Sequence, residues 1–269
     1  MLELYHSGLT TCSKQVRLCL REKDIPYESH YIELWNYENL NPEYLKLNPN
    51  GVVPALVHDG EPIFNSFVIT QYIEDLYPEK PLRPADPRDR ATMRLWTWTA
   101  DDVHLATTMI TYVNALRKHL DNDLGLADKE LMLASTPVPE RRERWRRMVT
   151  GGYNPDEIQL SLDKCSHCMG RMEEVLDPGP WLSGKEYSLA DIHMLSIVHR
   201  FRDLYPELLD PRNYPIITDW QTRMMPPPRR RLGVFHRYRR SAGPAGGEVD
   251  FGTWITGPPV GGIALAFAI

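Results

Sequence analysis

The segment YPEKPLRPADPRDR (77–90) has four prolines in fourteen residues and separates two halves of different character. Proline lacks a backbone N–H donor and fixes φ, so this segment should end one helix and stiffen the chain before the next. It predicts a linker at residues 81–87. A chain of 269 residues can form two domains with buried cores, and we expect them at residues 1–80 and 88–228.

Strand and helix patterns alternate in the first half. The predicted elements are a strand at 2–6, a helix at 13–24, a strand at 27–34, a short helix at 41–48, paired strands at 54–60 and 62–65, and a helix at 66–77. The sequence HDGEP between the paired strands is typical of a hairpin turn. These patterns predict a small α/β unit, close in length to a thioredoxin-like domain.

The second half shows helical periodicity and almost no strand pattern. The segments 88–120, 156–176, 188–203 and 216–225 predict an all-helical domain. Within it, SLAD (188–191) matches a capping box, in which Ser188 and Asp191 satisfy free N–H groups at a helix start. Residues 229–269 are rich in Pro, Gly and Arg without a period, so they predict an irregular extension.

Composition excludes several classes of function. The formal net charge is −5 and the pI about 6.0, so no overall charge favours nucleic acid or an anionic membrane. The basic cluster ERRERWRR (140–147) is interpreted as a solvated helix face. Four cysteines and no leader pattern before Leu2 favour a cytoplasmic protein without a disulfide framework. No run of 18 apolar residues predicts a membrane span.

The stretch LELYHSGLTTCSKQVRLCL (2–20) leads from a strand through small hydroxyl and thiol residues directly into a helix. A helix start has unpaired N–H groups and the positive end of the helix dipole. The hydroxyls of TTCS (10–13) therefore lie where an anion would be stabilised.

The motifs together resemble a glutathione transferase. The resemblance rests on TTCS at a helix start, VVP (52–54) before a strand, NS (65–66) opening a helix, the proline-rich linker and the SLAD box. It covers about 225 residues. The segments 82–98 and 136–153 are most similar to the bacterial β-etherase type, whose members use glutathione to open aryl ethers of lignin-derived dimers.

This resemblance implies glutathione as co-substrate and its thiolate as the anion at the helix start. It places Thr10 and Ser13 as joint catalytic residues, with Thr11 as a neighbouring glutathione contact. Ser13 has an alternative interpretation as a plain helix N-cap. Val53 and a cis Pro54 would bind the cysteinyl part of glutathione.

At the next helix start, Ser66 would bind the γ-glutamyl carboxylate. Asn65 would lie where the family usually has an acidic residue that pairs with the ammonium group. The resemblance further implies a homodimer and a small aromatic electrophile as the second substrate, without nucleic-acid or membrane partners.

Two other signals are interpreted as structural. CSHC (165–168) has metal-ligand spacing but lies in a helical segment without further ligands, so we expect buried thiols and no metal site. In DDVHLATTMITY (101–112), His104 and Tyr112 are possible cleft contacts but are not assigned catalytic roles. Alternatives are general conjugation of xenobiotics, a thiol–disulfide oxidoreductase using Cys12, and a non-catalytic binding module on the same fold.

Overall fold

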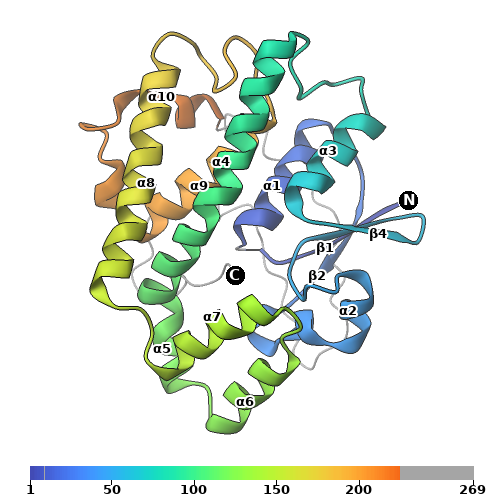
Figure 1. Ribbon diagram of the computed structural model, residues 1–269. Helices are drawn as coiled ribbons and strands as arrows, with labels where there is room; N and C mark the ends of the chain where they lie inside the picture. Colours follow the sequence, from blue (N-terminus) through green and yellow to red (C-terminus); the bar gives the residue numbers. More distant parts are fainter. Residues whose placement is uncertain (9, 225–269) are drawn as a thin grey trace.

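The computed structural model describes residues 1–8 and 10–224. It has the predicted fold class, with a thioredoxin-like α/β domain followed by a helical domain (Figure 1). The extension predicted at 229–269 lies outside the described residues. Within the two described ranges, no helix combines the length and apolar character needed to cross a membrane.

The N-terminal domain is built on a four-stranded sheet in the order β2-β1-β3-β4. Its strands are β1 (Leu2–His6), β2 (Glu28–Tyr31), β3 (Ala55–His58) and β4 (Glu61–Phe64). β1 pairs in parallel with β2 and antiparallel with β3, and β3 is antiparallel to β4. The tight turn between β3 and β4 has positive φ at Asp59 and Gly60, so the predicted hairpin is confirmed.

Three α-helices cover this sheet. They are α1 (Thr11–Glu22), α2 (Pro42–Leu47) and α3 (Ser66–Leu76), with short 3₁₀-helices η1 (Leu34–Asn36) and η2 (Glu38–Leu40) before α2. Figure 1 shows α1 and α3 together on one side of the sheet and α2 on the other. The starts of α1 and α3 therefore lie on the same side as the second domain.

The C-terminal domain is a bundle of helices. Its elements are α4 (Pro87–Thr111), a π-helical turn η3 (Tyr112–Leu116), α5 (Arg117–Asn122), α6 (Leu126–Ser135), α7 (Pro139–Thr150), α8 (Pro155–Leu176), α9 (Leu189–Leu204), the 3₁₀-helix η4 (Pro206–Leu209) and α10 (Pro215–Met224). Residues 189–201 of α9 are all buried, because this helix packs against both α4 and α1. Helix α9 therefore fixes the N-terminal domain against the bundle.

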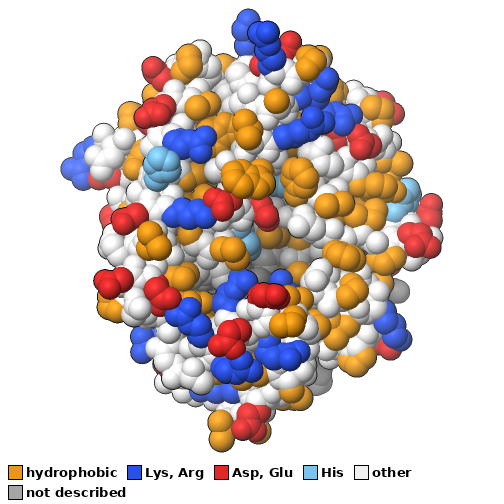
Figure 2. Space-filling view, in the orientation of Figure 1, with side chains coloured by type: hydrophobic (Ala, Val, Ile, Leu, Met, Phe, Trp, Pro, Cys, Tyr) orange, Lys and Arg blue, Asp and Glu red, His pale blue; other side chains and the backbone are white. Residues whose placement is uncertain are grey.

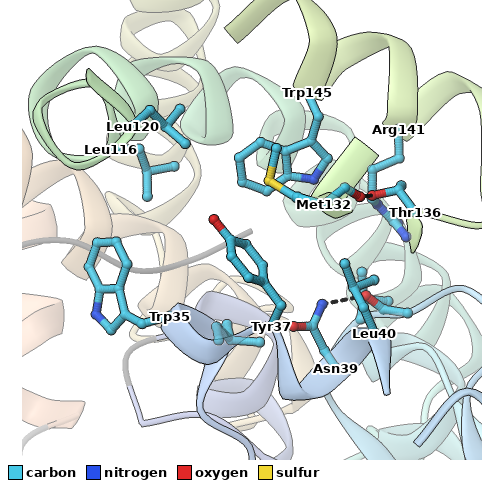
Figure 3. Close-up of a pocket in the computed structure, with 13 residues that line it drawn as sticks. Trp35, Tyr37, Asn39, Leu40, Leu116, Leu120, Met132, Thr136, Arg141 and Trp145 are labelled. Carbon is cyan, nitrogen blue, oxygen red and sulfur yellow. Dashed lines mark hydrogen bonds between the residues drawn. The ribbon is translucent and has the colours of Figure 1, made fainter. Parts of the chain in front are cut away.

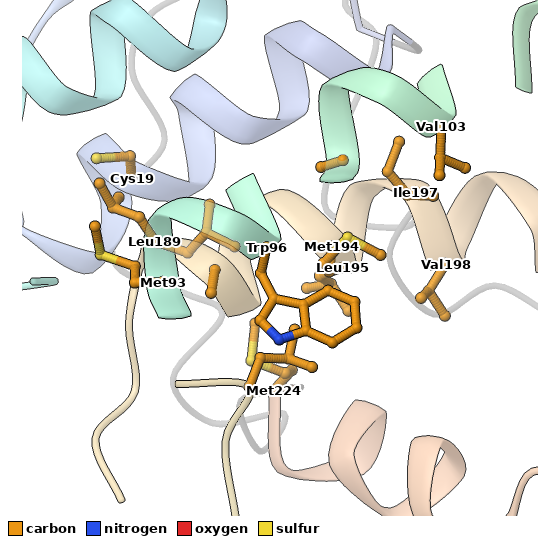
Figure 4. Packing of buried hydrophobic residues seen from close by; sticks show 14 of the residues in the cluster. Cys19, Met93, Trp96, Val103, Leu189, Met194, Leu195, Ile197, Val198 and Met224 are labelled. Carbon is orange, nitrogen blue, oxygen red and sulfur yellow. The ribbon is translucent and has the colours of Figure 1, made fainter. Parts of the chain in front are cut away.

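One hydrophobic cluster extends through both domains. It contains Leu4 and Leu20 of the N-terminal domain together with Trp96 of α4 and Trp220 of α10. Figure 4 shows Trp96 within the bundle, surrounded by other apolar side chains of the cluster. Complete burial of a large apolar side chain contributes about 1.5–3 kcal/mol, so this shared core holds the two domains in one arrangement.

The predicted capping box at the start of α9 is confirmed. The Ser188 side chain accepts a hydrogen bond from the N–H of Ala190, and Asp191 accepts one from the N–H of Ser188. Asp191 also accepts hydrogen bonds from Leu182 N at 3.1 Å and Trp220 Nε1 at 2.9 Å. Burial raises the pKa of Asp191 to about 6, although all these hydrogen bonds favour its ionised form.

Candidate active site

Thr10 caps the start of α1. Its Oγ1 accepts a hydrogen bond from Ser13 N at 3.3 Å and donates one to the Ser7 carbonyl at 3.4 Å. Ser13 lies in the first turn of the helix, fully buried, and its Oγ accepts from Ser7 N at 3.4 Å. The alternative interpretation of Ser13 as the N-cap is therefore wrong, because Thr10 already occupies that position.

The loop before α1 is held from inside the helix. Arg17 donates hydrogen bonds to the carbonyl groups of Ser7 at 2.8 Å and Gly8 at 2.6 Å. The sequence alone does not single out this residue, because an arginine on an amphipathic helix is normally a surface residue. Arg17 fixes the backbone from which the TTCS turn begins.

Thr11 and Cys12 complete the TTCS turn. Thr11 Oγ1 is buried, and no hydrogen-bond partner is present for it in the described part of the chain. Cys12 is partly exposed, and its Sγ lies 3.8 Å from His104 Nε2 of α4. Burial raises the pKa of Cys12, but the charge of His104 and hydrogen bonds from His104 and Ser66 outweigh it, so the net pKa is lowered.

A small pocket lies where α1, α3, α4 and α9 meet. Its lining residues are Cys12, Gln15, Ser66, Phe67, Ala100, Asp101, His104 and His193. Ser66, at the start of α3, thus faces the same space as the carboxylate of Asp101. Asn65 is instead the N-cap of α3, with Oδ1 accepting from Phe67 N at 2.9 Å and Val68 N at 3.3 Å. The start of α3 and an acidic group therefore share one pocket.

The peptide bond between Val53 and Pro54 is cis, as the resemblance implies. The loop that leads to it is fixed by two donors to the Val52 carbonyl oxygen, Tyr44 OH and Asn48 Nδ2, both at 2.6 Å. Val53 and Pro54 thus have a defined backbone orientation directly before β3.

A larger cleft opens between the domains beside this loop. Its walls are Leu34, Trp35, Tyr37, Asn39, Leu40, Gly51 and Val52 of the N-terminal domain, and Leu116, Leu120, Met132, Thr136, Arg141 and Trp145 of the helical domain. Figure 3 shows Trp35 and Tyr37 facing Leu116, Met132 and Trp145 across the space. Arg141 supplies the charge in this set, and it also donates a hydrogen bond to the Asn50 carbonyl.

The space-filling view in Figure 2 shows a hollow near the centre of this face of the molecule, with Lys and Arg side chains gathered below it. The cleft is mainly apolar and aromatic, as is typical of sites for small organic ligands. A small polar pocket and a larger aromatic cleft therefore lie within one molecule.

Two family models match the chain. The model "Glutathione S-transferase, N-terminal domain" matches residues 11–76, and "Glutathione S-transferase, C-terminal domain" matches residues 126–228. The chain belongs to the glutathione S-transferase family. This family uses glutathione as its co-substrate, in agreement with the sequence-based expectation.

Individual members of the family give the same result. Protein LigF of Sphingobium sp. strain SYK-6 is 32% identical over 201 residues, which cover 74% of this chain and 78% of LigF. The crystal structure of that protein, described as a β-etherase, superposes with a TM-score of 0.78 at 29% identity, covering 83% of this chain and 94% of LigF. A probable maleylacetoacetate isomerase 2 of Drosophila melanogaster is 27% identical over 217 residues, covering 80% of this chain and 79% of the relative.

In this glutathione S-transferase family member, the sequence-predicted residues fall into three groups. Thr10 is the cap of α1, and Thr11 and Ser13 lie in its first turn. Val53 and Pro54 form the cis peptide bond. Asn65 and Ser66 lie at the start of α3. His104 contacts Cys12. The sequence does not reveal this contact, because the two residues are 92 positions apart. Tyr112 is buried outside both pockets, with its hydroxyl donating to the Met148 carbonyl at 2.8 Å.

Cys165 and Cys168 are free, buried thiols of α8, as predicted. Burial raises the pKa of Cys168 to about 12. In the described ranges, a separate group of possible metal ligands, Glu3, Glu28 and His30, lies on β1 and β2 and contributes to neither pocket.

Proposed function

We propose that this family member is a β-etherase-like glutathione transferase that acts on lignin-derived aromatic compounds. Glutathione thiolate attacks the carbon that bears an aryloxide, a C–S bond forms, and the C–O bond breaks to release the phenol. A carbonyl group beside the reacting carbon assists the displacement, and a phenoxide is a much less basic leaving group than an alkoxide.

The observation that carries this proposal is the aromatic cleft beside the cis-proline loop. Gly51 and Val52 line the cleft and immediately precede Val53 and Pro54. A thiol held at this loop would therefore be next to the cleft. Trp35, Tyr37 and Trp145 offer flat apolar surfaces, which suit the two rings of an aryl ether dimer.

The proposed glutathione site extends from α3 to α1. The hydroxyl and backbone N–H of Ser66 bind the γ-glutamyl carboxylate, and Asp101 accepts the ammonium group in place of the acidic residue that the family usually has at position 65. The backbone of Val53, before Pro54, binds the cysteinyl unit. The support is that Ser66 and Asp101 line one pocket, while Asn65 is engaged as a helix cap.

At the other end of this site, Thr10, Thr11 and Ser13 with the first turn of α1 stabilise the thiolate. A free thiol has a pKa of about 8.5, and lowering it by about two units requires about 2.7 kcal/mol. One charge-assisted hydrogen bond of about 1.5–3 kcal/mol, with a helix N-terminus contributing about 0.3–1 kcal/mol, is sufficient.

We further propose a homodimer that functions in the cytoplasm. Exposed apolar side chains on β4, α3 and α4 support the dimer: Phe64, Val68, Leu95, Trp98 and Leu105. Exposed large apolar side chains are typical of a protein interface where they form a continuous patch.

The test is incubation of the protein with glutathione and a racemic β-aryl ether ketone. We expect release of the phenol and formation of the glutathione thioether from one enantiomer, because a closed pocket is chiral. Trp145→Ala in the cleft should lower kcat/KM by about tenfold or more, since a buried aromatic contact is worth a few kcal/mol. Leu160→Ala, at an exposed position on α8, is the matched control and should have no effect.

Conjugation of a halogenated nitrobenzene with both ether enantiomers left unreacted would contradict the β-etherase proposal. That outcome would favour the alternative function, general conjugation of xenobiotics.

A further inference from the structure

Cys12 differs from the other three cysteines in its surroundings. Cys19, Cys165 and Cys168 are buried in the hydrophobic core, and burial raises the pKa of each thiol. Cys12 is partly exposed, lines the small pocket and has an imidazole nitrogen 3.8 Å from its sulfur. Its side chain thus borders the pocket, and a possible proton acceptor lies beside its sulfur.

The groups around this pair favour its charged form. Burial lowers the pKa of His104, but the Cys12 thiolate and Asp101 outweigh this effect and raise it. Ser66 donates a hydrogen bond that lowers the pKa of Cys12. The positive charge of Arg200 on α9 acts in the opposite direction and lowers the pKa of His104.

His193, the other histidine of the pocket, has a different state. Burial lowers its pKa to about 3, so it is neutral at physiological pH. Its Nε2 is hydrogen-bonded to the Oγ1 of Thr70 on α3, at a distance of 2.9 Å. On the side of the larger cleft, burial and the charge of Arg144 lower the pKa of Arg141, while the charge of Cys12 acts in the opposite direction.

We propose that Cys12 and His104 form a thiolate–imidazolium pair, and that Cys12 is a site of mixed-disulfide formation with glutathione disulfide. The Cys12 thiolate attacks one sulfur of the disulfide, whose S–S bond breaks. A new S–S bond joins Cys12 to one glutathionyl unit, and the other unit leaves as glutathione thiolate. Attack by a second glutathione thiolate on the mixed disulfide reverses the step.

This reaction is distinct from transfer to an electrophile. It breaks no C–O bond and needs no aromatic substrate, and its nucleophile is a protein sulfur. Because Cys12 shares the small pocket with Ser66, the attached glutathionyl unit would obstruct the proposed γ-glutamyl site. The modification therefore makes the transferase responsive to the ratio of glutathione disulfide to glutathione.

The test is incubation of the full chain with glutathione disulfide at about pH 6.5, followed by intact mass and peptide mapping. We expect one glutathionyl group per chain, on Cys12, and no addition to Cys12→Ser. His104→Asn should slow the reaction about tenfold, because a thiol without its imidazolium is mostly protonated at this pH. His167→Asn, which alters an exposed histidine between two buried cysteines, should react at the wild-type rate.

The pH dependence gives a second readout that a purely structural role would not change. In the wild type the rate should reach half its maximum at lower pH than in His104→Asn, provided that circular dichroism shows both proteins folded. Addition to Cys165 or Cys168 in place of Cys12, absence of any addition, or equal rates in the wild type and His104→Asn would each overturn the proposal. Failure of ether cleavage would leave it unaffected.

Discussion

Thr10, Thr11 and Ser13 bring three hydroxyl groups to the start of α1, each in a different hydrogen-bonding state. Thr10 is engaged with Ser7 and Ser13, Ser13 accepts from the Ser7 N–H, and Thr11 has no partner among the described residues. Thr10 must therefore give up its hydrogen bond to the Ser7 carbonyl before it can donate to the sulfur, whereas Ser13 and Thr11 donate to no other acceptor among the described residues. The two proposed catalytic hydroxyls can be separated by mutation.

We predict that Thr10→Ala and Ser13→Ala each shift the acidic limb of the pH profile of kcat/KM upward, by about one unit or more. The reason is that loss of a charge-assisted hydrogen bond of about 1.5–3 kcal/mol raises the thiol pKa by that amount. Thr10→Ser keeps the hydroxyl and is the matched control. Unchanged profiles in both alanine variants would assign activation to backbone N–H groups.

At this scale, the sequence predicted the hydroxyl-rich helix start and the cis-proline correctly, but not the identity of the cap. A TTCS sequence offers three possible capping side chains, and only the path of the loop, fixed by Arg17, selects Thr10. The pairing of Cys12 with His104 depends on the packing of α1 against the second domain, which no local pattern encodes.

A buried ion pair of the N-terminal domain contacts the proline-rich segment 77–90. Lys23 Nζ, at the end of α1, lies 2.7 Å from Glu74 of α3, and both side chains are almost fully buried. Lys23 also donates to the carbonyl groups of Tyr77 and Lys80, each at 2.7 Å, while Glu74 accepts from Leu82 N at 3.1 Å. The two charges thus compensate each other, and backbone groups of the proline-rich segment satisfy their remaining hydrogen bonds.

We predict that Lys23→Met lowers the free energy of unfolding by about 3–5 kcal/mol, because it leaves the Glu74 carboxylate buried without its cation. Chemical denaturation monitored by tryptophan fluorescence measures this change. The double variant Lys23→Met/Glu74→Leu should recover part of the loss. An effect below about 1 kcal/mol, the value of a surface ion pair, would contradict a structural role for this buried pair.

Most elements were predictable because their apolar residues follow a clear period, as in α1, α3 and α8. Helix α6 was not predicted, since Met132 is its buried residue and the rest of its surface carries little apolar pattern. Helix α7 was foreseen only as a solvated basic face. Its role as a wall of the cleft, through Arg141 and Trp145, follows from tertiary packing.

At the scale of the whole molecule, the two domains share one hydrophobic core and enclose the cleft between them. The order of motifs predicted the α/β domain, the helical domain and the family. The cleft was beyond prediction from the sequence, because its walls come from residues 34–52 and 116–145, two segments that only the fold brings together.

The proposed chemistry requires that this arrangement of the two domains binds glutathione and holds its sulfur as a thiolate. The most direct measurement is a pH titration of the ultraviolet absorbance of the thiolate in the complex of wild-type protein with glutathione. We predict that the bound thiol titrates about two units below the free value of about 8.5. Titration at the free value, or no binding at millimolar glutathione, would contradict the proposed role of the site.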